Sequence, residues 1–253
     1  MAAAPAATGS RRGKEHGLEQ QLSKLVERLR SAFGDRLVSA ILYGSGAVGD
    51  WHEKSSDLNV LCVLSRLSTQ ELAAAEPIFR WWREQGNPPP LLLTAEEVRT
   101  SSDCFPMEFH DIQERRRVLH GIDLMQDLTI DRSFYRAQVE HELRSKLIRL
   151  RQKAGELLSD GDRLTKLMTD SISTFCVLGR HALILSGHEP HWKKQETVDA
   201  LGNAMGMQLS AANEILAIRA AANKRSKADT RALLEQYMSE MDALVRFVDK
   251  LDR

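Results

Sequence analysis

The sequence has little cysteine, no net charge and no long apolar run. Its 253 residues include three cysteines, Cys62, Cys104 and Cys176, whose wide spacing excludes a CxxC metal site and argues against a disulfide framework. Lysine plus arginine and aspartate plus glutamate number 35 each, so no overall field draws the chain to nucleic acid or to a membrane surface. No segment approaches the roughly 18 apolar residues of a membrane span. We therefore expect a soluble, cytoplasmic protein without a nucleic-acid or membrane partner.

The N-terminal segment lacks the apolar core of a secretory signal. Residues 1–17, "MAAAPAATGSRRGKEHG", are small and polar, without the apolar core of about 7 to 15 residues found in a secretory signal. We expect neither a signal nor an anchor there, and a disordered tail over residues 1–17. The whole sequence is 42% hydrophobic, which is enough for a substantial core in the remainder.

The spacing of apolar residues changes near residue 127. Before that point, short apolar runs alternate with polar turns. After it, almost every segment has helical spacing and predicts a bundle of five helices. The expected fold class is α+β, with a mixed sheet and helices over residues 18–126 followed by an all-α helical bundle over residues 127–253.

Within the first part, several elements carry local signals. A helix begins at Leu18, and a helix over residues 69–84 has Ser68 as its N-cap. Thr94 is expected to cap a short helix. The segment "FPMEFHDIQERRRVLHG", residues 105–121, predicts one long strand or a hairpin.

Two strands in "LYGSGAVGDWHEKSSDLNVLCVL", residues 42–64, flank a glycine-rich turn. A strand that runs into Gly44 and Ser45 and then into a short helix would present backbone N–H groups to an anion. Glycine allows close approach of the backbone, and the Ser45 hydroxyl can donate a hydrogen bond. The alternative is an ordinary turn without a ligand.

The second strand of this segment carries a polar face. Side chains alternate along a strand, so Asp57 and Asn59 share one face, while Leu58 and Val60 point to the other. A carboxylate beside a phosphate-binding turn is the arrangement that metal-assisted phosphoryl or nucleotidyl transfer requires.

These residues resemble the nucleotidyltransferase fold of the polymerase-beta superfamily, in which a Gly-Ser pair is followed by Asp-x-Asp or Asp-x-Glu. The resemblance covers residues 36–64 well and residues 65–121 only in topology. It implies transfer of a nucleoside monophosphate from a nucleoside triphosphate, ATP in our interpretation, to a small-molecule or protein acceptor, with magnesium ions held by carboxylates. It implies that Gly44 and Ser45 contact the triphosphate and that Asp57 binds metal.

The second carboxylate of that pattern is replaced by Asn59. An amide oxygen at this metal position cannot supply the negative charge that bridges two cations. A third acid, which the family has on a neighbouring strand, would come from Glu108 or Asp111. Their odd separation places them on opposite faces of a regular strand, so at most one lines the site. We favour Glu108; the alternative is that both are solvated.

A segment of the helical part, Gly187 to Lys194 with Pro190 between them, is similar to the helical domain of aminoglycoside and other small-substrate nucleotidyltransferases. This similarity implies that Lys193 or Lys194 binds the triphosphate as a point charge and that the acceptor lies between the sheet and the bundle. Two solvated lysines at a helix start are the alternative.

Two functions therefore remain after the sequence has been read. The first is a magnesium-dependent nucleotidyltransferase of weak or lost activity. The second is a catalytically inactive module on the same fold that binds nucleotide or another protein. Asn59 is the feature that separates them.

Overall fold

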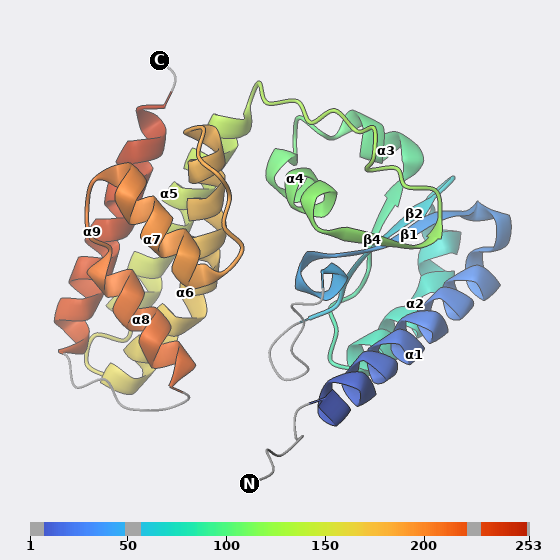
Figure 1. Ribbon diagram of the computed structural model, residues 1–253, viewed down its shortest axis with the longest axis horizontal. Helices are drawn as coiled ribbons and strands as arrows, with labels where there is room; N and C mark the ends of the chain where they lie inside the picture. The colour runs from blue at the N-terminus through green and yellow to red at the C-terminus, as the bar shows by residue number, and fades with distance from the viewer. Residues whose placement is uncertain (1–7, 49–56, 222–228, 252–253) are drawn as a thin grey trace, which may run out of the picture. The chain divides into compact units, whose positions relative to one another are not determined.

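The computed structural model describes residues 8–48, 57–221 and 229–251 (Figure 1). The chain divides into two compact units, Met1–Asp131 and Arg132–Arg253, close to the boundary expected after residue 126. The first unit contains a mixed sheet with helices, and the described part of the second contains helices only. The predicted α+β class is confirmed.

The sheet of the first unit has four described strands in the order β3-β2-β1-β4. They are β1 (Leu37–Tyr43), β2 (Asn59–Leu64), β3 (Leu91–Thr94) and β4 (Arg116–Gly121). Strand β1 runs antiparallel to both β2 and β4, whereas β2 and β3 are parallel. The sheet is therefore mixed, as predicted.

Helices cover both faces of this sheet (Figure 1). Alternation along β2 sends Val60 and Cys62 to one face, where they pack with α1 (Thr8–Phe33) and α2 (Thr69–Glu84). It sends Leu61 and Val63 to the other face. That face packs against α3 (Ala95–Thr100) and α4 (Pro106–Glu114). Burial on both faces explains the continuous apolar sequence of β2.

The two residues predicted to cap helices, Ser68 and Thr94, are N-caps in the structure. The Ser68 hydroxyl accepts a hydrogen bond from the Gln70 N–H, and α2 spans the predicted residues. Thr94 and Glu97 form a reciprocal capping box at the start of α3. Both predictions are confirmed because each signal acts within one turn of the chain.

The prediction of a long strand or a hairpin over residues 105–121 is wrong. Residues Pro106–Glu114 form α4, and only Arg116–Gly121 form a strand. Proline is favoured in the first turn of a helix, and the three-residue spacing of Phe109 and Ile112 buries one helix side. Glu108 and Asp111 are therefore neighbours on a helix surface, and the argument that placed them on opposite faces fails.

The N-terminal helix begins at Thr8, so the prediction of disorder over residues 8–17 is wrong. Helix α1 thus extends beyond the apolar stripe that the prediction used, although Gly9, Gly13 and Gly17 have low helix propensity. Residues 1–7 lie outside the described residues.

The described part of the second unit contains five helices, as predicted: α5 (Tyr135–Gly155), α6 (Gly161–Leu185), α7 (Lys194–Met205), α8 (Ser210–Ala220) and α9 (Thr230–Asp249). Helix α6 is central, since it contacts the other four. It ends before Gly187, whose φ of 77° lies in the left-handed region that favours glycine. No helix in the described chain combines the length and the apolar character that crossing a membrane requires.

Candidate functional site

The glycine turn follows β1 directly. The chain leaves β1 at Tyr43 and enters a 3-10 turn, Gly44–Ala47. Gly44 has a φ of 78°, a conformation that other residues rarely adopt. Its N–H donates to the carbonyl of Arg115 at 2.9 Å. This N–H is therefore already used within the protein. Because Gly44 has no side chain, an anion could still approach its Cα closely.

Asn59 lies beside this turn. It pairs with Tyr43 across the β1–β2 ladder. A Cβ added at Gly44 would lie 3.7 Å from the Asn59 side-chain nitrogen Nδ2. Asp57 is exposed and precedes the first residue of β2 by two positions. The structure thus places the turn, the asparagine and the aspartate at one end of the β1–β2 pair.

Leu58 anchors the segment between Asp57 and Asn59. Its side chain packs against Gly46, where an added Cβ would lie only 2.9 Å from Leu58 Cδ2. Its N–H donates to the buried side-chain oxygen of Asn87 at 3.1 Å. Sequence reasoning missed Asn87, although the Gly86-Asn87 pair before three prolines marks a turn. The first contact holds the start of β2 against the glycine turn, and the second ties it to the segment before β3.

Glu108 reaches the same side of the sheet from α4. Burial, and then the charge of Glu108, raise the pKa of the Tyr43 phenol. Tyr43 directly precedes Gly44 and pairs with Asn59. Asn59 also shares a strand face with Leu61, and that face packs against α4. The structure therefore brings the exposed Glu108 carboxylate into the electrostatic neighbourhood of the turn.

The site is poor in carboxylates. The four described strands contain no aspartate or glutamate. In the part of the chain that the structure describes, Asp57 belongs to no group of three side chains that could jointly hold a metal. The donors near the turn are the Asp57 carboxylate, the Asn59 amide oxygen and Glu108. This set fits one magnesium ion that keeps water and phosphate ligands, and it does not fit two ions bridged by carboxylates.

The two lysines expected at the site belong to the second unit and differ in their surroundings. Lys193 is paired with Glu196 at 2.9 Å, and its side chain is 76% exposed. The pKa of Lys194 is lowered, first by burial and then by the nearby Arg219. Arg219 itself donates to the carbonyl of Thr169 at 2.6 Å. Lys194 is therefore a cation beside a second cation, which is the more favourable environment for an anion.

The comparisons with known proteins give one kind of match. No protein-family model and no curated protein matches the sequence. Among solved structures, the crystal structure of spectinomycin adenyltransferase from Enterococcus faecialis, with ATP and spectinomycin, matches with a TM-score of 0.61 and 15% sequence identity. The match covers 92% of this chain and 99% of that chain. At this identity the likeness shows a shared fold alone, a domain with a mixed sheet followed by helices.

Proposed function

We propose that this protein binds a nucleoside triphosphate, ATP first, together with magnesium at the Gly44–Ser45 turn. The observation that supports the proposal is the proximity of Asn59 to the half-buried Gly44 at one end of the β1–β2 pair. The fold supports it, because a similar fold belongs to an adenyltransferase whose structure contains ATP. The electrostatic proximity of Glu108 to Tyr43 adds a carboxylate on the same side.

Each residue has a separate role in this proposal. The Gly44 backbone and the Ser45 hydroxyl contact the triphosphate. Asp57 and Asn59 hold one magnesium ion through a carboxylate and an amide oxygen, and this ion would neutralise charge on the triphosphate when bound.

The proposed reaction is nucleotidyl transfer. An acceptor hydroxyl attacks the α-phosphorus in line with the bond to the leaving pyrophosphate, so one P–O bond forms and one breaks. The hydroxyl proton passes to Glu108, which is the exposed acid on the same side of the sheet as Asn59. The acceptor class is a small molecule or a protein that carries a hydroxyl group.

Transfer by the native protein is expected to be weak. Loss of one preorganised electrostatic group at a reacting centre typically costs about 10²- to 10³-fold in rate. The replacement of the second carboxylate by Asn59 is such a loss. The absence of aspartate and glutamate from the described strands supports a second candidate, a catalytically inactive nucleotide-binding or protein-interaction module.

The substitution Asn59→Asp tests the proposed chemistry. The two side chains are nearly isosteric, so the variant adds charge with little change in packing. We expect pyrophosphate release from ATP in the presence of magnesium to increase at least about tenfold over wild type. The control is Asn203→Asp, which adds the same charge at an exposed position on α7 and should change nothing.

Two results would decide against parts of the proposal. A rapid wild-type reaction, unaffected by Asn59→Asp and abolished by Asp57→Asn, would contradict the argument from the missing charge. Nucleotide binding without pyrophosphate release in either protein would support the inactive module instead.

A further inference from the structure

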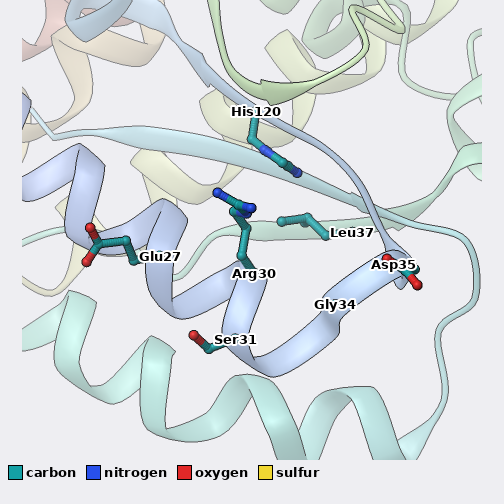
Figure 2. Close-up of a pocket in the computed structure, with 7 residues that line it drawn as sticks. All are labelled: Glu27, Arg30, Ser31, Gly34, Asp35, Leu37 and His120. Carbon is teal, nitrogen blue, oxygen red and sulfur yellow. The ribbon is translucent and has the colours of Figure 1, made fainter.

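A concave site lies on the sheet face opposite to Asn59 (Figure 2). It is a cavity of about 640 Å³ between the C-terminal part of α1 and the edge strand β4. The 3-10 turn Gly34–Arg36 and the start of β1 complete its wall. Helix α1 covers the sheet face opposite to the one that carries Asn59 and α4. The cavity is therefore separate from the proposed nucleotide site.

A break in the strand register turns His120 toward this cavity. Val118 pairs with Ile41, but His120 pairs with Ala40, so β4 contains one extra residue between two consecutive residues of β1. Ile41 packs on the face of α3 and α4, whereas Ala40 packs on the face of α1. Such a bulge re-aims a side chain. In a regular strand, residues two positions apart share a face, so without the bulge His120 would lie on the same face as Val118, the one that packs against α3 and α4.

Arg30 approaches the same space from the last turn of α1. Figure 2 shows the ends of the Arg30 and His120 side chains directed toward one another. Within the described residues, neither side chain has a hydrogen-bond or ion-pair partner.

Several other arginines of the same unit have side-chain partners. Arg28 stacks over Trp81, with its guanidinium carbon 4.4 Å from the ring centroid. Arg36 binds Glu71, and Arg117 binds Glu19. Arg30 and His120 therefore form a pair of hydrogen-bond donors without a described protein partner, one of them a guanidinium cation.

The chemistry of these groups selects an oxyanion. A guanidinium group donates two parallel N–H bonds to the oxygens of a phosphoryl or carboxyl group, and an imidazole N–H adds a third donor. The carboxylates of Glu27 and Asp35 lie on either side of the pair in Figure 2 and restrict the anion to a compact one. We infer that the α1–β4 cavity binds the phosphoryl group of a small ligand through Arg30 and His120.

Nuclear magnetic resonance of the histidine rings tests this inference on the full chain. Inorganic phosphate and glycerol 3-phosphate are added separately at neutral pH and constant ionic strength, with chloride as the balancing anion. We expect at least one of them to shift the ring signals of His120 with saturation. The phosphate that saturates at the lower concentration identifies whether free phosphate or a phosphomonoester is the better ligand.

Two arginine variants make the test specific. Arg30→Met should weaken the binding measured at His120 about tenfold, because it removes a charge-assisted pair of hydrogen bonds. Arg28→Met is the matched control, since it removes an arginine of the same helix outside the cavity, and it should leave the affinity unchanged. Absence of a saturable shift with both phosphates, or equal affinity in wild type and Arg30→Met, would overturn the inference. The outcome is independent of nucleotide binding at Asp57, because the observed ring lies on the other face of the sheet.

Discussion

The position that a Cβ would take on Gly44 lies 3.7 Å from the side-chain nitrogen of Asn59. This spacing is ordinary van der Waals contact, so the asparagine tolerates a small addition at the glycine. It also means that a ligand against the Gly44 backbone has Asn59 as its immediate neighbour. The proposed nucleotide site depends on this relationship more than on any other.

Gly44→Ala should weaken nucleotide binding beyond its effect on stability. The left-handed conformation of Gly44 costs another residue about 1 to 2 kcal/mol. In addition, the new methyl group would stand between the backbone and the triphosphate, and we expect affinity for ATP with magnesium to fall about tenfold. Calorimetric titration and thermal unfolding measure the two effects.

Gly86→Ala is the control for Gly44→Ala. Gly86 has a φ of 85°, and an added Cβ there would meet no atom within 4 Å. It should lower stability by a similar amount and leave ATP affinity unchanged. Equal loss of affinity in both variants would show that the Gly44 effect is one of folding alone.

Glu240→Ala should destabilise the helical unit by about 2 kcal/mol. The Glu240 carboxylate, which is 2% exposed, accepts the N–H groups of Ala211 and Ala212 at 2.7 and 2.9 Å and thus caps α8 from α9. Its loss leaves buried N–H donors without a partner. Denaturant unfolding checks the value, with the exposed Glu235→Ala as a control that should change stability by less than about 0.5 kcal/mol.

Glu71 should make the first unit sensitive to acid. A hydrogen bond from the Ser68 hydroxyl, together with one from Arg66, lowers the pKa of Glu71, and Arg36 donates a further bond at 3.0 Å. A lowered pKa in the folded state stabilises the protein above the unfolded pKa, and this contribution is lost as the pH falls through the folded pKa.

Glu71→Gln therefore tests that dependence. The variant should be less stable than wild type at neutral pH, and the difference should shrink as the pH falls below about 4.3, the ordinary pKa of glutamate. Urea unfolding over a pH series measures it. Glu76→Gln is the control, because the Glu76 side chain is 68% exposed and its pair with Arg80 is solvated. A constant difference for Glu71→Gln at all pH values would contradict the assignment.

Short-range signals explain which elements could be predicted. Ser68 and Thr94 begin their helices through contacts within one turn, and the apolar run of β2 follows from burial on both faces. The helix over residues 106–114 was predicted as a strand because apolar and polar residues alternate around Met107 and Phe109. Pro106 in the first turn, and burial at a spacing of three, favour the helix that forms.

The candidate site was less accessible to prediction. The glycine turn and Asn59 were visible because they lie close along the chain. The role of Asn87 in holding Leu58 was not, since that bond joins residues 29 positions apart. The influence of Glu108 on Tyr43, and the use of the Gly44 N–H by Arg115, depend on how α4 and β4 pack. Contacts between residues far apart in the sequence produce no periodic pattern from which they could be predicted.

Calorimetric titration with ATP, with and without magnesium, tests the central claim most directly. We compare wild type, Asp57→Asn and the control Asp127→Asn, which changes an exposed aspartate of the same unit. The account predicts saturable binding to wild type and to Asp127→Asn that requires magnesium and weakens at least about tenfold in Asp57→Asn. Absence of heat with wild type at millimolar ATP, or binding that is equal in all three proteins, would contradict it.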